Sequence, residues 1–140
     1  MTPPDTQAIL LDALDDERKA EAAYAAAIAR FGPVRPFVNI IEAERRHADA
    51  IERQLRRLGF AIPANRWEGG AAAPESLAAA CAAAIQAEVD NIALYDRLLP
   101  QIADPIVRQV LENLQAASRD NHLPAFRRCL AREEGRAGPR

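Results

Sequence analysis

The sequence is poor in the residues that mark several common classes of protein. It contains two cysteines, Cys81 and Cys129, which are too few for a disulfide framework and do not form a CxxC pair. We therefore expect both to be buried free thiols. Aromatic residues make up only 5% of the chain, and β-branched residues are sparse. This composition argues against a β-sheet.

Neither sign of charge dominates, and long apolar runs are missing. The 18 basic and 20 acidic residues leave a net charge of −2, which gives no overall attraction to phosphate backbones or anionic lipids. We therefore expect no nucleic-acid partner. Because there is no cationic N-terminal segment followed by an apolar run, and no stretch of about 20 apolar residues, we expect no membrane association and a cytoplasmic location.

The length and the positions of proline and glycine predict one helical domain. A chain of 140 residues can bury a core without a structural metal, so a bound metal would serve chemistry. Ten prolines and six glycines fall mostly between alanine- and leucine-rich stretches, as they do when they mark helix ends. We predict four helices, over residues 6–31, 36–58, 74–99 and 104–131, followed by a frayed polar tail over 133–140.

The connections predict how these helices are arranged. The first two helices are joined by a few residues, as are the last two, so each pair forms an antiparallel hairpin. Residues 59–74 form a longer connection, which we expect Phe60, Ile62 and Trp67 to attach to the bundle. About fifteen extended residues can cover about 50 Å, more than the roughly 35 Å length of a 23-residue helix. The predicted fold is therefore all-α, a four-helix bundle with ferritin-like connectivity.

Each predicted helix carries ionisable side chains in its apolar stripe. Burial of such groups without partners costs several kcal/mol per ion, so they must meet something in the core. Glutamate oxygens and imidazole nitrogens are suited to iron, manganese or zinc, which predicts a metal site. The residues near the middle of the stripes are Glu17, Glu44, His47, Glu88 and His122.

A short internal repeat relates the two halves of the chain. Glu17 and Tyr24 in the first helix have the same separation as Glu88 and Tyr95 in the third. With one histidine on the second helix of each hairpin, the repeat suggests two related helix pairs around a pseudo-twofold axis.

Four segments resemble the ferritin-like superfamily on its rubrerythrin side, and most of all its small uncharacterised bacterial and archaeal members. They are DDERKAEAAY, FVNIIEAERRH, AEVDNIALYDRLL and NLQAASRDNHLPAF, and the resemblance covers about residues 6–130. It implies a four-helix bundle, a homodimer, and a di-iron centre that reduces peroxide or oxidises ferrous iron with dioxygen or peroxide as oxidant. By matching position, the resemblance assigns the metal ligands to Glu17, Glu44, His47, Glu88 and His122.

Two iron ions would be held by this set in a specific way. Glu44 and one further carboxylate would bridge them, each histidine would take one ion, and Glu17 and Glu88 would cap the two ends. Tyr24 and Tyr95 would hydrogen-bond to the ligands or donate electrons. Five candidate ligands suit one ion better than two, so a mononuclear site stays open, with manganese or zinc as other ions. Glu21 and Asp120 are the candidates for an additional carboxylate.

The sequence also departs from the rubrerythrin pattern, which leaves a second interpretation. Asn91 stands where rubrerythrins have a further carboxylate, and Arg119 stands three residues before His122 in place of a bridging glutamate. In this alternative, Arg119 enters the core and pairs with a buried glutamate, and the chain is a metal-free structural or interaction module. We also expect Pro124 to bend the last helix, because it cannot donate a hydrogen bond to the Asp120 carbonyl.

Overall fold

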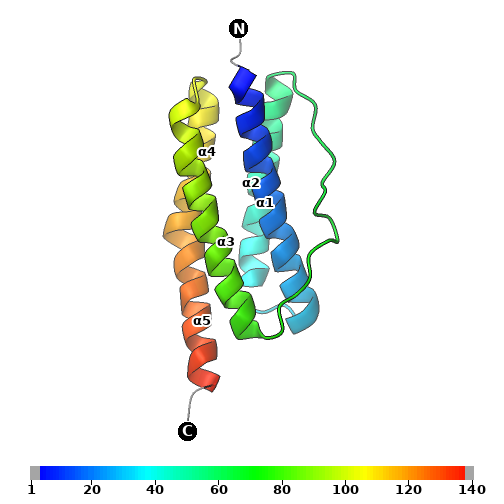
Figure 1. Cartoon of the computed structure of the whole chain (residues 1–140), viewed down its shortest axis with the longest axis vertical. Coiled ribbons are helices and arrows are strands. Elements are labelled where there is room, and N and C mark those ends of the chain that lie inside the picture. Colours follow the sequence, from blue (N-terminus) through cyan, green and yellow to red (C-terminus); the bar gives the residue numbers. More distant parts are fainter. Residues whose placement is uncertain (1–3, 138–140) are drawn as a thin grey trace.

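The computed structural model describes residues 4–137, and these residues form helices without a strand (Figure 1). Helices α4, η2 and α5 follow one another without a break, so the described residues form four long helical stretches. The all-α four-helix bundle is therefore confirmed. The elements are α1 (Pro4–Phe31), α2 (Phe37–Arg57), α3 (Leu77–Leu98), the 3-10 helix η1 (Leu99–Gln101), α4 (Pro105–Ala117), the π-helix η2 (Ser118–His122) and α5 (Leu123–Ala137).

The helix ends follow the local chemistry, with two differences from prediction. Gly32, with φ +88°, ends α1, and the Asp104 side chain caps α4 by accepting hydrogen bonds from two backbone amides. Helix α3 begins at Leu77, later than predicted, because the Ser76 hydroxyl caps it. The last helix continues to Ala137, so the predicted frayed tail is wrong for residues 133–137, while residues 138–140 lie outside the described part.

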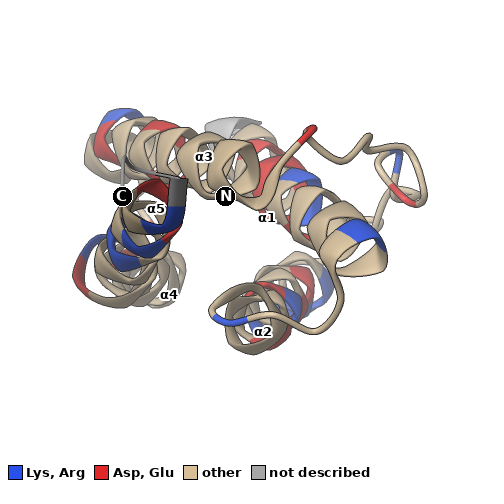
Figure 2. Cartoon of the chain, turned by 90° about the horizontal axis from the view of Figure 1, so that it is seen from below, with Lys and Arg blue, Asp and Glu red and all other residues tan. Residues whose placement is uncertain are grey.

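The long connection between α2 and α3 runs along the outer side of α1, as Figures 1 and 2 show. The Trp67 indole Nε1 donates a hydrogen bond to Asp15 Oδ1 at 2.9 Å, and Arg66 donates to both oxygens of the same carboxylate at 2.8 Å. Phe60 and Ile62 pack against the core. The connection therefore crosses the bundle lengthwise and is attached where the sequence predicts.

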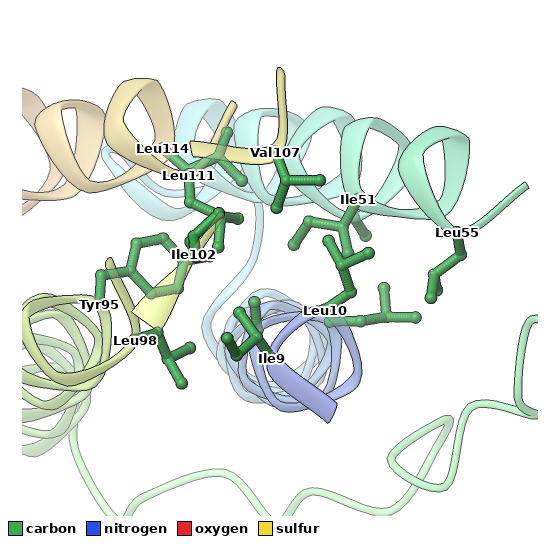
Figure 3. Packing of buried hydrophobic residues seen from close by; sticks show 13 residues of the cluster. Ile9, Leu10, Ile51, Leu55, Tyr95, Leu98, Ile102, Val107, Leu111 and Leu114 are labelled. Carbon is green, nitrogen blue, oxygen red and sulfur yellow. The ribbon is translucent and has the colours of Figure 1, made fainter. Parts of the chain in front are cut away.

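The core consists of two apolar clusters near opposite ends of the bundle. The first apolar cluster, drawn in Figure 3, contains Ile9, Leu10, Ala13, Leu14, Ala48, Ile51, Leu55, Tyr95, Leu98, Ile102, Val107, Leu111 and Leu114. The second apolar cluster contains Ala20, Tyr24, Ala27, Phe37, Ile40, Ile41, Ala80, Cys81, Ala84, Phe126 and Cys129. On every helical stretch, buried polar residues stand in the sequence between the residues of the first cluster and those of the second.

The two cysteines correct one prediction. Cys81 of α3 and Cys129 of α5 form a disulfide bond inside the second apolar cluster, so the expectation of two free thiols is wrong. They lie 48 residues apart in the sequence and come together only because α3 and α5 pack as an antiparallel pair. Their spacing alone carries no signal of this pairing.

Helix α3 is unusually apolar for a helix of this bundle. By length and composition, Leu77–Gln101 could cross a membrane, with a mean hydropathy of 1.3, although 28% of that window is buried inside the protein. Eight alanines and several Leu and Ile residues make up its apolar part, and the same helix buries Glu88 and Asn91. Because it packs against α1 and α5, we describe it as a helix of the bundle.

A π-helical turn interrupts the last helical stretch just before Pro124. The Leu123 amide donates to the Ser118 carbonyl, five residues earlier. Proline has no amide hydrogen, and its ring would clash with the carbonyl four residues before it. The π-turn accommodates both effects, and it buries Ser118 and His122 while Arg119 and Asp120 face the solvent. Such single-turn insertions occur frequently at functional sites.

Candidate metal centre

The five residues that the sequence marks as metal ligands lie together in the middle of the bundle. The three glutamate side chains are almost completely buried, and the exposed fractions of the two histidines are 8% and 5%. Each helical stretch contributes at least one side chain, so the site depends on the packing of both hairpins. The contributors are Glu17 from α1, Glu44 and His47 from α2, Glu88 from α3 and His122 from η2.

These side chains form two groups of three that share Glu44. The Glu17 triad consists of Glu17, Glu44 and His47, and the Glu88 triad consists of Glu44, Glu88 and His122. Within each triad, one ligand atom from each residue lies within 4.8 Å of the others. The two imidazole rings stack with centroids 5.5 Å apart. Glu44 therefore lies between the two triads, in the position of a bridging carboxylate.

Contacts within the triads have the spacing of ligands around an ion. His47 Nδ1 lies 3.4 Å from Glu17 Oε1, and His122 Nδ1 lies 3.0 Å from Glu44 Oε1 and 3.3 Å from Glu88 Oε1. Ligands bonded to one ion at about 2.0–2.2 Å are separated from one another by about 3.0–3.4 Å. Direct imidazole–carboxylate pairs have the same spacing, so these distances are compatible with a metal ion and the triads could hold one.

Several buried polar atoms of the site make no hydrogen bond within the described part of the chain, although four of them lie within ion-pair distance of another member of the site. Among the described residues, five buried side-chain atoms have no hydrogen-bond partner, and all five belong to the two triads. Buried polar atoms are normally paired, and an unpaired one costs about 1–3 kcal/mol. The five atoms are Glu17 Oε2, Glu44 Oε1, His47 Nδ1, Glu88 Oε1 and His122 Nδ1.

The central carboxyl group is the one that most resists ionisation. The pKa of Glu44 is raised well above its ordinary value, first because the side chain is buried and then because the charges of Glu17 and Glu88 oppose a third negative charge. A cation in the triads would remove this opposition. The site therefore favours either a proton on Glu44 or a metal ion beside it.

Two tyrosines donate hydrogen bonds to the outer carboxylates, one in each triad. The Tyr24 hydroxyl donates to Glu88 Oε2, and the Tyr95 hydroxyl donates to Glu17 Oε1 at 2.8 Å. In the sequence, each tyrosine follows the glutamate of its own helix by seven residues. Its hydroxyl instead contacts the glutamate of the other hairpin. Burial, followed by the charge of the accepting glutamate, raises the pKa of both phenols well above their usual range.

The two additional carboxylates considered from the sequence lie outside the cluster. The Glu21 side chain is 28% exposed and pairs with Arg45. The Asp120 side chain is 60% exposed and pairs with Arg119. Neither belongs to either triad. The structure therefore does not bring these two residues to the site.

Arg119 does not enter the core. Its side chain is 55% exposed, and its Nε donates to Asp120 Oδ1 at 3.0 Å. The π-turn rotates this position outward, so the alternative in which Arg119 pairs with a buried glutamate is wrong. Arg119 therefore supplies no positive charge to the triads.

A further polar group beside the Glu88 triad was not identified as a unit from the sequence. Asn91 Nδ2 donates to Asp16 Oδ2 at 2.7 Å, and the Ser118 hydroxyl donates to Asn91 Oδ1 at 3.0 Å. The pKa of Asp16 is raised because the carboxyl group is largely buried, an effect that the Asn91 hydrogen bond opposes. The position of Asn91 on the buried stripe of α3 indicates that its side chain is buried. Its hydrogen-bond partners depend on how the helices pack and cannot be read from the sequence.

Comparison with known proteins supports the fold and does not identify the chain. No family model and no curated protein sequence matches it. Among solved structures, the hypothetical protein MJ0754 from Methanococcus jannaschii DSM 2661 is similar, with a TM-score of 0.86 and 21% sequence identity. The match covers 96% of this chain and 84% of that protein. At this identity the likeness shows the fold alone, a four-helix bundle, whose buried Glu and His groups here could bind a metal.

Proposed function

We propose that this chain is a ferritin-like metalloprotein that binds two iron ions in its core and reduces hydrogen peroxide. The observation that carries the proposal is the pair of triads that share Glu44, in which five buried ligand atoms make no hydrogen bond within the described residues. The residues fit two ions in the manner expected from the sequence. His47 would hold one and His122 the other, with Glu44 between them.

The donor set supports iron or manganese over softer ions. Three carboxylates and two imidazoles are hard and borderline ligands, whereas thiolate-preferring ions would lack a sulfur ligand because both cysteines form the disulfide bond. Three glutamates also offset most of the charge of two divalent ions in a site that excludes water. When bound, redox-active ions supply electrons to a small oxidant such as peroxide or dioxygen.

The chain's own residues prepare this site for that chemistry. Tyr24 and Tyr95 orient Glu88 and Glu17 through hydrogen bonds, which is the role that outer hydrogen-bond partners play around metal ligands. Both phenols keep their protons because their pKa values are raised. The two apolar clusters exclude bulk water from either side of the ligand layer.

The test is a metal count followed by a peroxide assay. We expect elemental analysis of protein reconstituted anaerobically with ferrous ions to give two irons per chain. The loaded protein should then consume hydrogen peroxide, and the metal-free protein should not. The matched control is Asp49→Ala, which changes an exposed acidic residue of α2 outside both triads and should retain both ions.

Each result has a distinct meaning for the proposal. A count of zero after ferrous reconstitution would contradict metal binding. One ion per chain would favour the mononuclear alternative. Two ions without peroxide consumption would leave the metal site intact and contradict the proposed reaction. The homodimer and the cytoplasmic location stay predictions, which sedimentation and cell fractionation can examine.

A further inference from the structure

The disulfide bond has a specific position relative to the Glu88 triad. Cys81 lies seven residues before Glu88 on α3, and Cys129 lies seven residues after His122 on α5. Seven residues make two helical turns, or about 10 Å along the axis. Because α3 and α5 are antiparallel, both offsets lead toward the same end of the bundle. The sulfur pair therefore lies two turns from the triad, on the faces that carry two of its ligands.

Two packed aromatic residues occupy the space between the sulfur pair and the triad. The Tyr24 and Phe126 ring centroids lie 5.0 Å apart, and the Tyr24 hydroxyl donates to Glu88. Phe126 belongs to the same apolar cluster as both cysteines and lies between His122 and Cys129 on α5. The sulfur pair therefore shares one apolar cluster with Tyr24, whose hydroxyl contacts a candidate metal ligand.

Within residues 4–137, the Glu17 triad has no comparable neighbour. Its tyrosine, Tyr95, belongs to the first apolar cluster, whose other members are aliphatic. Both cysteines of the chain are in the second apolar cluster. Among the described residues, the two triads thus have similar ligands and similar tyrosines, and a group that can store electrons lies two helical turns from the Glu88 triad.

We propose that Cys81 and Cys129, in the dithiol form, donate two electrons to peroxide through the Glu88 triad. This inference rests on the peroxide-reducing function proposed above. Overall, two thiols and one hydrogen peroxide give one disulfide and two water molecules. The S–S bond forms and the O–O bond breaks. Sulfur is oxidised by two electrons, oxygen is reduced by two, and the two thiol hydrogens end on the two water molecules.

The burial of the sulfur atoms is the reason for assigning the reaction to the triad. The exposed fractions of Cys81 and Cys129 are 0% and 1%, whereas those of His47 and His122 are 8% and 5%, so a small oxidant reaches the histidine side of the site more readily than the sulfur atoms. Oxidation of accessible thiols needs no metal, whereas oxidation of these thiols should depend on it. In the cytoplasm, where we expect the chain to reside, disulfide bonds are usually transient and catalytic or redox-sensing.

The experiment counts thiols and peroxide in the same sample. The full chain is reduced, freed of reductant without oxygen, loaded with ferrous ions and mixed with hydrogen peroxide. Thiols are then counted by alkylation and mass measurement after acid denaturation. Two bound ferrous ions supply two electrons themselves, so we expect about two equivalents of peroxide to be consumed and two thiols per chain to be lost. The Cys81→Ser, Cys129→Ser double variant should consume one equivalent less.

Two controls use unaltered protein and therefore do not depend on the folding of a variant. The metal-free chain and the zinc-loaded chain should lose thiols at least tenfold more slowly, because zinc has no redox chemistry. Equal rates of thiol loss with and without iron would overturn the proposal.

A pair of tyrosine variants tests whether electrons pass from the cysteines to the Glu88 triad through Tyr24. The quantity compared is the number of thiols lost per peroxide consumed. Tyr24→Phe removes the hydrogen bond to Glu88 and should lower this ratio severalfold, whereas Tyr95→Phe removes the equivalent bond to Glu17 and should leave the ratio unchanged. Equal ratios in the two variants would contradict the path through Tyr24.

The remaining outcomes separate this inference from the proposed function. If the iron-loaded protein consumes peroxide and keeps both thiols, the donor role of the cysteines is overturned and the peroxide-reducing function stands. If the iron-loaded protein consumes no peroxide, the proposed function fails, and the donor role fails with it.

Discussion

The two triads have matching ligands and different surroundings. Each consists of an outer glutamate, a histidine and the shared Glu44, and in each the outer glutamate accepts a hydrogen bond from a tyrosine of the other hairpin. The Glu17 triad lies on two uninterrupted α-helices. The Glu88 triad depends on the π-turn that buries His122 and lies two turns from a disulfide bond.

This difference indicates how one half of a pseudosymmetric site can acquire a separate role. The glutamate, histidine and tyrosine of each triad occur in both hairpins. The residues around each triad, such as the two cysteines, differ between the hairpins. Asn91 and Ser118 form a hydrogen-bonded group beside the Glu88 triad, and the position equivalent to Asn91 in the first hairpin is Ala20. Variants of one triad at a time, and of the residue that both share, test this interpretation.

The largest effect should come from Glu44→Leu, which alters both triads at once. We expect the variant to bind no iron under conditions that give two ions in the parent chain. With free metal at 100 times the dissociation constant, each ion adds about 2.7 kcal/mol to the free energy of unfolding. Calorimetry with and without iron should therefore show a stabilisation of about 5 kcal/mol in the parent and none in the variant.

The metal-free form provides the control for that substitution. Replacement of a buried ionisable group by an apolar side chain of similar volume is often neutral or stabilising. The metal-free variant should therefore be at least as stable as the metal-free parent. Retention of both ions by a folded Glu44→Leu chain would show that this residue is not the bridge.

The next largest effect should come from the histidines taken singly. His47→Ala should lose the ion of the Glu17 triad, and His122→Ala should lose that of the Glu88 triad, each leaving one ion per chain and about half of the metal-dependent stabilisation. Elemental analysis and calorimetry on the two variants check this. Loss of both ions in either variant would mean that the triads are filled only together.

A smaller effect concerns the pH dependence of the metal-free protein. Because the folded-state pKa of Glu44 is raised, its contribution to stability is fully present below the ordinary glutamate pKa and is lost as the pH rises through the raised value. The loss is at most about 1.4 kcal/mol per pH unit. Glu44→Gln should remove this component from unfolding curves measured between about pH 4 and pH 8.

Iron should reverse the sign of that dependence. Metal ligands must be deprotonated, so the affinity rises with pH and the loaded protein should gain stability over the same range. Parallel unfolding curves for the parent and Glu44→Gln without metal would show that Glu44 has an ordinary pKa in the folded protein.

The smallest effect should come from Arg119→Glu. This position is exposed and paired with Asp120, so the new carboxylate would face solvent and add no ligand to the Glu88 triad. We expect the iron count to be unchanged and the stability to shift by less than about 0.5 kcal/mol. A gain of iron occupancy in this variant would mean that the π-turn can rotate position 119 into the core.

The fold and the positions of the candidate ligands could be predicted because helix ends and apolar stripes depend on residues close together in the sequence. The helix ends at Gly32 and Asp104 follow from backbone conformation and capping, and the apolar stripe of each helix directs Glu17, Glu44 and Glu88 inward. Burial of so many ionisable groups is costly enough that their convergence could be expected before the structure.

The features that the sequence did not predict depend on packing between distant segments. The disulfide bond requires that α3 and α5 pack with Cys81 opposite Cys129. Each tyrosine reaches the opposite hairpin because α1 and α3 are neighbours, which no spacing within one helix reveals. The π-turn had a partial signal in Pro124, which indicated a disturbed helix but not that the disturbance would turn Arg119 outward.

The most direct test of the account is a crystal structure of the iron-reconstituted chain with anomalous diffraction recorded at the iron edge. The account predicts two anomalous peaks on opposite sides of the Glu44 carboxylate, one contacted by Glu17 and His47 and the other by Glu88 and His122. Absence of anomalous density between the two apolar clusters, with the five side chains packed against one another, would contradict it.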